Sequence, residues 1–443
     1  MKMLAEICDA LQTVFGTDTE VAAAESNVIR RQRKFDAVSL AKTFVLAFLK
    51  NPNANDKEIV DMAMSVGVMV SHQAITQRYS GRLVDFFETL FHRVTQHVIK
   101  SDACVAPLLS RFTSVELLDS TTVTLPAGLE IRFRGCGGSD GGGKSALKLQ
   151  TEFSLCSGAI RCVEVESGRN PDGASSRQKA SREAGSLRIA DLGYFNLKVF
   201  QDMDDSNAYY LSRYHNGTTV FIDGEAVPSL ASWLSEQKKN VVEKDVELGV
   251  KARLGCRLIA YRMPARIAAR RRENRIKMML GKHNSVPSKE SLALCDWTIL
   301  ITNTSSSLLS VDEAMVMQRA RWQIELLFKR WKSLGKISQL DDESDEKAMA
   351  KFWARMIAAT IQHWLTVAAA WGNTRKQSLT RTAEKVKKYV IRIAESFPNL
   401  RPLKKVLRKF LKESAHTCKK QKRSVPGTFE LLYNPGLLNY GLT

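Results

Sequence analysis

Cysteine and histidine are scarce in this 443-residue chain, and neither shows the spacing that metal sites use. The eight cysteines include no CxxC pair, and the seven histidines show no zinc-like spacing. This pattern excludes the common zinc-finger and dithiol motifs. The cysteines are therefore expected to be reduced thiols of a cytosolic protein.

Long apolar runs are missing as well. No stretch approaches the roughly 18 to 20 uncharged apolar residues of a membrane span. The N-terminal segment carries Glu6 and Asp9 within its apolar part, which argues against a signal peptide. Hydrophobic residues make up 44% and charged residues 25% of the chain, as in globular proteins. At this length we expect two or three domains.

Acidic residues are outnumbered by basic ones. Sixty-six Lys and Arg against 46 Asp and Glu give a formal net charge of +20. The cations gather in two runs, 266–277 and 385–423, which few acids interrupt. Such runs favour nucleic acid as a partner, because basic side chains displace its condensed counterions. A basic surface without a partner is the simpler alternative, and a membrane surface lacks an amphipathic anchor rich in Trp or Phe.

Residues 1–110 have the pattern of helices. The loop string NPNAND separates two helical stretches, and Asp56 is the expected N-cap of the second. Gly67 and a cap at Ser71 then lead into a helix over 72–91. This order outlines a helix-turn-helix, although any small helical bundle has such corners. The side chains placed to meet DNA are His72, Gln73, Thr76, Gln77 and Arg78.

From residue 114 onward, β-branched and alternating residues predict strands in an α/β arrangement. The predicted strands are 115–125, 130–135, 146–155, 160–166, 187–191, 208–215 and 296–303. Residues 216–294 have the pattern of a strand-rich insertion that carries an arginine-rich helix around 266–280. Long helices are expected over 311–335 and 347–371, followed by a basic, partly helical tail.

A glycine-rich segment imitates a phosphate loop. Gly138, Gly143, Lys144 and Ser145 satisfy the pattern GxxxxGK[ST], which binds nucleotides only between a strand and a helix. The residues that follow alternate as a strand, so a hairpin loop is the better interpretation. A nucleotide hydrolase is the corresponding alternative.

One predicted helix places four polar side chains in a row. Gln318, Arg321, Glu325 and Lys332 fall on one face at 100° per residue. A carboxylate beside two cations suits a phosphate and metal site. The alternative is an ordinary salt-bridged surface, because Arg321 and Glu325 are spaced as a stabilising i, i+4 pair. The neighbouring apolar stripe, which would dock the helix, is Ile324, Leu327, Phe328 and Trp331.

Two aspartates come directly after short apolar runs, at or near the end of a predicted strand. Asp119 follows the apolar run VELL, and Asp191 follows LRIA. Either aspartate alone is as well explained by a turn. With Glu325 they supply three carboxylates, and Mg²⁺ prefers such hard oxygen ligands. Two ions about 3.5 to 4 Å apart would activate a water and stabilise a leaving oxygen in phosphoryl transfer.

The segments LLDST and ADLGYF and the pattern R-x(3)-E-x(6)-K resemble the motifs of DDE transposases of the insertion sequence four family. The resemblance covers roughly residues 30–370. It implies a ribonuclease-H-like mixed sheet with flanking helices, a β-rich insertion between the second Asp and the Glu, and an all-α N-terminal DNA-binding domain. The expected division is 1–110 (N-terminal domain), 111–215 (first part of the core), 216–294 (insertion), 295–372 (second part of the core) and 373–443 (basic C-terminal region).

By this resemblance, Asp119, Asp191 and Glu325 form the catalytic triad and bind Mg²⁺, for which Mn²⁺ can substitute. Arg321 and Lys332 match the signature positions that grip DNA near the cleaved end.

Five further residues are expected to contact DNA. Gln318 stands where the signature carries Tyr, and its amide can still donate a hydrogen bond. Trp297 matches a strand Trp that stacks on a base turned out of the duplex, although a Trp simply buried in a strand is an equal alternative. The arginines expected to bind phosphates are Arg270, Arg271 and Arg272.

The implied reaction is cut-and-paste transposition. Water nicks one strand at a terminal inverted repeat, the freed 3′-OH forms a hairpin on the opposite strand, a second water opens it, and the 3′-OH joins target DNA. Tyr194 is expected to pack in its turn rather than to attack. The expected partners are double-stranded DNA and a second copy of the chain in a synaptic complex, in the bacterial cytoplasm at the nucleoid and without a membrane.

Two alternatives stay open at this point. A DNA-binding regulator derived from a transposase would keep the basic surfaces and lose catalysis. A structure-specific nuclease of the same core fold would cut DNA without joining it.

Overall fold

The computed structural model divides the chain into two compact units, each assembled from three segments. The residues described are 2–31, 33–101, 106–137, 143–340, 344–397, 399–421 and 424–438. Unit 1 comprises Met1–Cys104, Asp119–Asn170 and Gln323–Lys422. Unit 2 comprises Val105–Leu118, Pro171–Trp322 and Arg423–Thr443.

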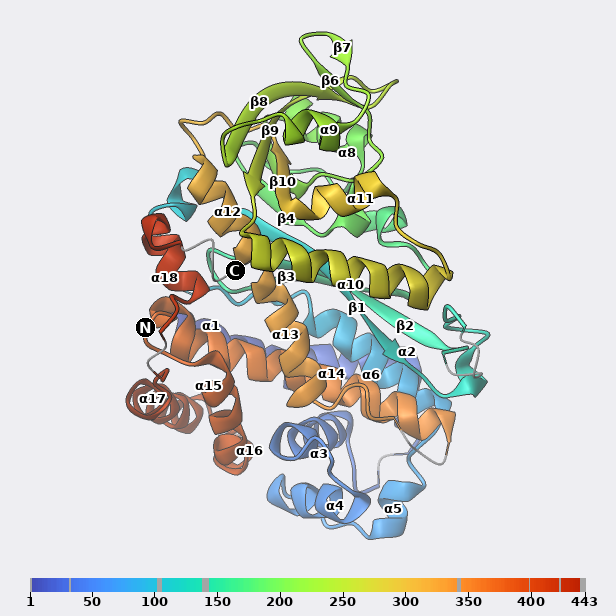
Figure 1. The fold of residues 1–443 in the computed structure, drawn as a ribbon. Helices are drawn as coiled ribbons and strands as arrows, with labels where there is room; N and C mark the ends of the chain where they lie inside the picture. Colours follow the sequence, from blue (N-terminus) through green and yellow to red (C-terminus); the bar gives the residue numbers. More distant parts are fainter. Residues whose placement is uncertain are drawn as a thin grey trace. The chain divides into compact units, whose positions relative to one another are not determined.

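The helices of unit 1 pack around one long, buried helix, α14. Almost every side chain of α14 is buried, because the helix is apolar on all sides rather than along one stripe. The rings of Phe91 and Trp353 lie 5.4 Å apart between α6 and α14, and Figure 1 shows these two helices side by side. The helices that contact α14 (Asp345–Ala370) include α3 (Ala37–Lys50), α6 (Gly81–Val94), α15 (Leu379–Val386) and α17 (Leu400–Thr417).

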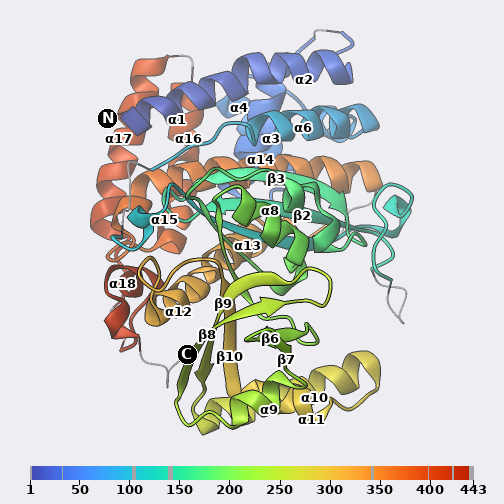
Figure 2. The same cartoon turned by 90° about the horizontal axis from the view of Figure 1, so that it is seen from above.

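Further helices complete unit 1 (Figure 2). They are α1 (Lys2–Thr13), α2 (Thr19–Ser26), α4 (Asp56–Ser65), α5 (His72–Thr76), α13 (Trp322–Ser333, from its second residue) and α16 (Val390–Ser396). Helix α2 packs on α6, and α1 packs on α17.

The predicted helix-turn-helix region differs from expectation in two places. The N-cap of α4 is Asn55, not Asp56, and it forms a capping box with Glu58. Asp56 is instead buried and accepts a hydrogen bond of 3.0 Å from the hydroxyl of Tyr79. The single helix predicted over 72–91 is also wrong, because the backbone is extended at Ser80 and separates α5 from α6.

Unit 1 also holds one edge of the mixed sheet, in the order β3-β2-β1. Strands β2 (Ala146–Ser154) and β3 (Ile160–Ser167) are antiparallel, and β1 (Val115–Thr124) contributes its second half. The ring of Phe153 on β2 lies 5.4 Å from that of Trp371, which follows α14. This sheet edge therefore shares its core with the helices of unit 1.

The strand predicted over 130–135 is wrong. A 3₁₀ turn at Ala127–Leu129 begins the segment, and the N–H of Phe133 donates to the carbonyl of Leu129. Ile131 is fully exposed, so this residue gains no burial that would favour a strand. Arg134 forms an isolated bridge with Ser145.

The sheet of unit 2 runs in the order β1-β4-β5-β10-β9-β8-β6-β7. Strands β1, β4 and β5 are parallel, and the pairs from β5 to β10 onward are antiparallel. The strands are β4 (Leu187–Ala190), β5 (Tyr209–Arg213), β6 (Val220–Ile222), β7 (Glu225–Ala226), β8 (Val241–Leu248), β9 (Leu254–Arg262) and β10 (Trp297–Thr302). The predicted mixed α/β fold and the strand-rich character of 216–294 are confirmed.

The helices of unit 2 flank this sheet (Figure 1). They are α7 (Ser176–Lys179), α8 (Leu197–Asp205), α9 (Leu230–Ser235), α10 (Ala265–His283), α11 (Lys289–Ala293), α12 (Val311–Ala320) and α18 (Thr428–Tyr433). One hydrophobic core joins α8 and α9 to strands β5, β6, β8, β9 and β10. At its centre, the rings of Phe200 and Tyr210 stack 4.4 Å apart.

The long helix predicted over 311–335 consists of two helices. Helix α12 ends at Ala320 and α13 begins at Trp322, with Arg321 between them. Arg321 keeps helical dihedral angles, so the chain continues in nearly the same conformation. Within the described part of the chain, no helix combines the length and the apolar composition needed to cross a membrane.

Candidate active site

Two of the three predicted catalytic carboxylates belong to unit 1. Asp119 lies in β1 and is half-buried, and its Oδ1 accepts a hydrogen bond of 2.8 Å from the N–H of Ser120. Glu325 is half-buried in the first turn of α13. The predicted docking stripe of α13 is confirmed, since all four of its side chains are buried: Ile324, Leu327, Phe328 and Trp331.

Lys332 is tied to the strand that carries Asp119. Its ammonium donates a hydrogen bond of 2.9 Å to the carbonyl of Thr122, and partial burial lowers the pKa of Lys332. This contact connects α13 to β1 within unit 1. The grip of Lys332 on DNA stays a prediction.

The third carboxylate, Asp191, follows the end of β4 in unit 2. Leu118 and Ala190 are register partners in the parallel pair β1–β4, so Asp191 comes one residue after a paired position, as Asp119 does along its own strand. A Cβ on Gly193 would lie 2.8 Å from a carboxylate oxygen of Asp172. A larger residue at Gly193 would therefore displace the side chain of Asp172.

Tyr194 packs in this turn, as predicted. It is 1% exposed and shares a small core with Leu118 and Ala190. Its carbonyl accepts a hydrogen bond of 2.5 Å from the amide of Gln178, and Arg188 donates to both the carbonyl and the side chain of Gln178. This buried support for the turn escaped sequence analysis, although an arginine inside the buried strand LRIA is itself an unusual signal.

Arg321 lies beside Asp191. One guanidinium nitrogen is 3.9 Å from Oδ1 of Asp191, and the Arg321 side chain is buried while 45% of the Asp191 side chain is exposed. The structure thus brings together one predicted ligand and one predicted DNA contact within unit 2.

Gln318 is buried in α12. It is 8% exposed, and neither amide atom of its side chain has a partner among the described residues. Buried amides are normally satisfied, and leaving one unpaired costs about 1–3 kcal/mol. Gln318 is therefore expected to destabilise the fold of the protein when no DNA is bound.

Trp297 begins β10 inside the core of unit 2. It is 7% exposed, and the guanidinium of Arg262 lies 4.6 Å from the centre of its ring. A base could stack on this face only after Arg262 moved. Base stacking by Trp297 stays a prediction.

The predicted phosphate-binding arginines of α10 differ in their surroundings. Arg270 is exposed. Arg271 donates to the carbonyl of Trp297, and Arg272 pairs with the carboxylate of Asp296.

The candidate DNA-reading residues of the N-terminal helices are mostly exposed. His72, Gln73, Thr76 and Gln77 face solvent. Arg78 is half-buried, with its guanidinium 5.5 Å from the ring centre of a phenylalanine, and burial lowers the pKa of Arg78.

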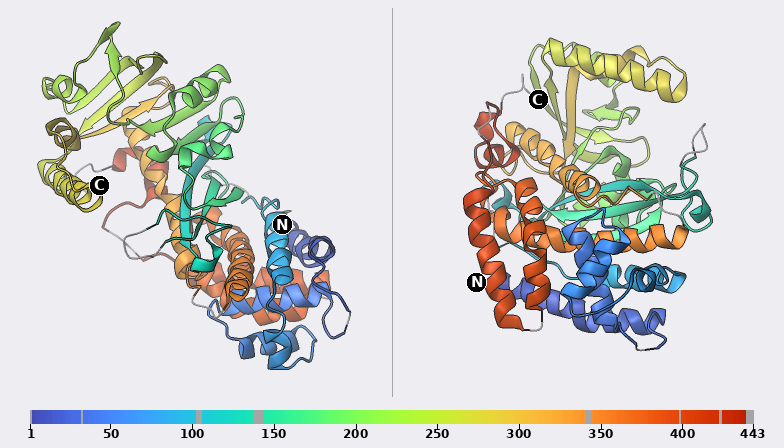
Figure 3. Two further views of the ribbon diagram at one scale, coloured as in Figure 1. Left: turned by 90° about the vertical axis from the view of Figure 1, so that its right-hand side faces the viewer. Right: turned by 90° about the horizontal axis from the view of Figure 1, so that it is seen from below.

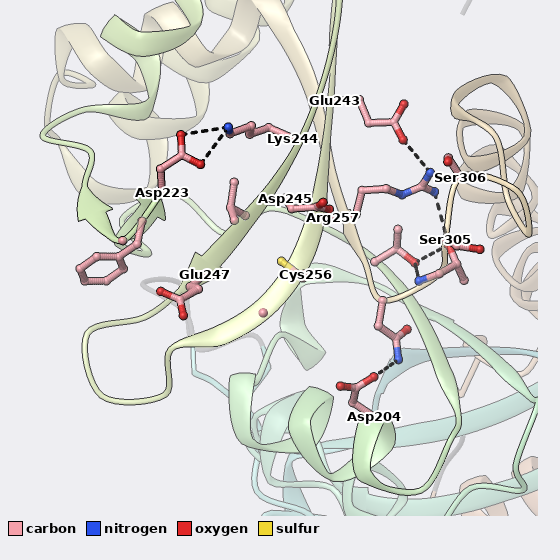
Figure 4. Close-up of a pocket in the computed structure, with 17 residues that line it drawn as sticks. Asp204, Asp223, Glu243, Lys244, Asp245, Glu247, Cys256, Arg257, Ser305 and Ser306 are labelled. Atoms are coloured by element: carbon pink, nitrogen blue, oxygen red, sulfur yellow. Dashed lines mark hydrogen bonds and ion pairs between the residues drawn. The ribbon is translucent and has the colours of Figure 1, made fainter.

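A cavity of about 790 Å³ opens in unit 2 beside β8, β9 and the segment after β10 (Figure 4). Most of its charges are paired internally. Lys244 binds Asp223 at 3.0 Å, and Arg257 binds Glu243 at 2.8 Å. The cavity contains none of the predicted catalytic residues.

The cavity wall does hold the start of α12 in place. Arg257 donates to the carbonyl of Leu309 at 2.6 Å. Arg111 donates to the carbonyl of Leu308 and forms a two-bonded pair with Glu313, at 2.7 and 2.8 Å. These contacts fix the helix that carries Gln318. No local sequence pattern distinguishes these two arginines from other surface cations.

Two predictions concern sites that the structure does not assemble. Across the described residues, no three His, Cys, Asp or Glu side chains are close enough together to hold a metal ion, so the triad stays a prediction. In the imitation phosphate loop, Gly138 lies outside the described residues, and the segment after Ser145 is strand β2 rather than a helix. The phosphate-loop geometry is therefore absent there.

Comparison with known proteins places these motifs in a family. The family model of the transposase DDE domain matches residues 110–361, which is more than half of the chain and includes all three carboxylates. A transposase of insertion sequence element IS231B from Bacillus thuringiensis subsp. berliner is 25% identical over 379 residues, covering 80% of this chain and 78% of that protein. A transposase of IS1151 from Clostridium perfringens is 25% identical over 309 residues, covering 65% of each chain. As the motif resemblance indicated, the chain belongs to the family of transposases with a DDE domain.

Proposed function

We propose that this protein is a DNA transposase that cuts and joins DNA by phosphoryl transfer, with Asp119, Asp191 and Glu325 as the catalytic triad. The observation that carries the proposal is the position of these carboxylates inside the matched DDE domain, residues 110–361. Each also stands at the position that its family motif requires.

The donor set suits a divalent cation. All three residues offer carboxylate oxygens, which are the ligands that Mg²⁺ and Mn²⁺ prefer. Both aspartates come one residue after the register partners Leu118 and Ala190. When bound, two cations would activate a water and stabilise the leaving oxygen.

The remaining site residues would hold the DNA. Arg321 would bind a phosphate next to Asp191, and its burial leaves the guanidinium little freedom to reorient. Lys332 is held by the carbonyl of Thr122 and would pair with a second phosphate. Gln318 would give its unpaired amide a partner on the DNA. Trp297 would stack on an extruded base once Arg262 has moved.

The proposed chemistry is a series of displacements at phosphorus. Water cuts one strand at a terminal inverted repeat and leaves a 3′-OH and a 5′-phosphate. The 3′-OH attacks the opposite strand and closes a hairpin, a second water reopens it, and the same 3′-OH attacks target DNA. Each step exchanges one P–O bond for another, so no covalent enzyme intermediate is needed.

The partners follow from this reaction. The substrates would be double-stranded DNA, namely the inverted repeats and the target, in the bacterial cytoplasm at the nucleoid. Two DNA ends must meet before joining, so we propose a homodimer in the synaptic complex. The basic face of α17 would add phosphate contacts, because its cations point away from the buried residues Leu403, Leu407 and Phe410.

The test is a cleavage assay on labelled DNA that carries the inverted repeat flanking the gene. Wild type and E325Q would be compared with Mg²⁺ or Mn²⁺ on a denaturing gel, with E346Q as a matched control because Glu346 is an exposed carboxylate elsewhere in unit 1. We expect metal-dependent cleavage and a hairpin-sized product from wild type and E346Q, and none from E325Q.

Metal binding is tested separately by titrating Mn²⁺ and recording its paramagnetic resonance signal. The proposal predicts that D119N and E325Q take up less Mn²⁺ than E346Q does. DNA binding without cleavage by wild type would instead indicate a regulator, and cleavage without joined product would indicate a nuclease.

A further inference from the structure

Helix α10, the long yellow helix in Figure 3, lies at the edge of unit 2. It packs chiefly against the 3₁₀ turn Leu294–Asp296. Ala268 is buried, and most of the other side chains are half-buried or exposed. A helix of 19 residues with so little packing gains little hydrophobic stabilisation, since helices in proteins owe most of their stability to a buried face.

The described cations of α10, which lie between Arg266 and Lys277, divide into two sets with different tasks. Arg271 donates to the carbonyl of Trp297 at 3.2 Å and to the hydroxyl of Thr298 at 3.0 Å. Arg272 pairs with Asp296, and Arg275 donates to the hydroxyl of Ser291 at 3.1 Å. These three arginines attach the helix to the rest of unit 2.

The other cations form a row on the opposite side. Arg266, Arg270 and Lys277 are all exposed. At 100° per residue they fall within about 40° of one another, and about 140–180° from the buried Ala268 and from Arg275. At about 1.5 Å per residue the row is roughly 16 Å long. We call Arg266, Arg270 and Lys277 the α10 cation row.

We propose that the α10 cation row binds the phosphate backbone of DNA independently of base sequence, while Arg271, Arg272 and Arg275 hold the helix in position for that contact. The inference rests on the proposed function for its ligand. Charge complementarity supports it, because duplex DNA carries one negative charge per about 1.7 Å of its axis. A row of roughly 16 Å would follow about half a helical turn, given a turn of about 34 Å.

One acidic residue lies beside the α10 cation row and provides an independent test. Glu273 is exposed and lies on the same face, three residues after Arg270 and four before Lys277. It reduces the positive potential of the row. If DNA binds there, removing the carboxylate must strengthen binding, whereas a purely structural row would not respond in this way.

The experiment measures binding of the full chain to a duplex of random sequence, without divalent metal, over a range of salt concentrations. A plot of log affinity against log salt concentration has a negative slope. We expect R266Q/R270Q/K277Q to make this slope about 2.7 less steep, because three phosphate contacts contribute about 0.9 each. With affinities taken as equal at about 1 M salt, this corresponds to roughly 500-fold weaker binding at about 0.1 M salt. E273Q should bind several-fold more tightly than wild type.

The matched control is K238Q/K239Q/K251Q, which removes the same charge from exposed positions elsewhere in unit 2. Its slope should change by less than about one contact, and circular dichroism should show that all variants are folded. An equal loss in the control, or an unchanged slope in the row variant, would overturn the proposal. So would loss of self-association with intact DNA binding, because that assigns the row to a protein partner. Since no metal is present, failure of cleavage by the triad cannot produce either result.

Discussion

Replacing Gln318 by methionine would remove a buried amide that has no partner in the free protein. Gln318 is 8% exposed, and both polar atoms of its side chain are unpaired among the described residues. Methionine has a similar length and no strong need for a hydrogen bond. Because an unsatisfied buried polar group costs about 1–3 kcal/mol, we expect Q318M to raise the free energy of unfolding by about 1–2 kcal/mol.

The matched comparison is Q178M in the same unit. Gln178 is 1% exposed, but its amide donates to the carbonyl of Tyr194 and its oxygen accepts from Arg188. Removing this amide leaves buried partners unpaired, so Q178M should lower the free energy of unfolding by about 1–3 kcal/mol.

Thermal unfolding followed by circular dichroism separates the two variants. Each kcal/mol corresponds to roughly 2–4 °C in Tm for a unit of this size. Q318M should therefore melt higher than wild type, and Q178M lower. If Q318M melts as low as Q178M, the amide of Gln318 is satisfied in solution and the reasoning fails.

The same substitution should impair the reaction. If Gln318 meets its partner on DNA, Q318M loses that hydrogen bond in the complex, and a cleavage assay should show slower formation or opening of the hairpin. A substitution that raises stability and lowers activity is typical of a residue that is retained for ligand binding rather than for stability. Full activity of Q318M would contradict a DNA contact at this position.

Three further predictions concern stability. Burial lowers the pKa of His363 from 6.5 to about 3, so below pH 6.5 this residue takes up a proton in the unfolded chain and not in the folded one. The free energy of unfolding should therefore fall by up to about 1.4 kcal/mol per pH unit between pH 6.5 and 3. In urea titrations at pH 7, 6 and 5, H363Q should lose less stability with falling pH than wild type does. Burial by itself would raise the pKa of Glu313, but the hydrogen bonds from Arg111 and Ser310 lower it overall. The ionised carboxylate therefore stabilises the folded protein above pH 4.5, and this contribution is lost as the pH falls further. Melting curves of E313Q should lack this loss of stability in acid. Gly158 has φ +73°, and a Cβ there would lie 2.4 Å from the ring of a buried tryptophan. In denaturant titrations G158A should therefore lower the free energy of unfolding by about 2–4 kcal/mol. G137A is the control: it has a similar φ of +74° and no described atom within 4 Å of the added Cβ, so it should cost only about 1–2 kcal/mol.

Local sequence signals placed Asp191 correctly after a strand end, whereas Asp119 lies inside β1 rather than at or near its end. Asp119 and Asp191 each follow a short apolar run, and both runs are strands in the structure. The spacing of the signature helix also placed its apolar stripe correctly, since periodicity depends only on the helix itself. These features required no knowledge of distant contacts.

Features that depend on the tertiary environment could not be predicted. Nothing near Gln318 in the sequence shows that its amide is buried without a partner among the described residues, because α12 packs on α18 and β5, which are distant in the sequence. Arg271 and Arg272 look like their exposed neighbour Arg270 in the sequence, and only the position of β10 and its preceding turn separates them. The prediction of a strand over 130–135 was wrong for the same reason. Alternating residues predict a strand, but Ile131 is fully exposed and gains no stabilisation from burial in a sheet.

The division of each unit among three distant segments has a consequence for synthesis on the ribosome. Helix α1 (Lys2–Thr13) packs on α17 (Leu400–Thr417), and α3 and α6 pack on α14. At about 5–20 residues per second, α1 waits roughly 20 to 80 s for its partner to be translated. During that interval the N-terminal helices can pack on one another, as α2 does on α6, but the faces that meet α14 and α17 lack their native cover. A premature stop before α14 would leave those helices without the helix on which they pack.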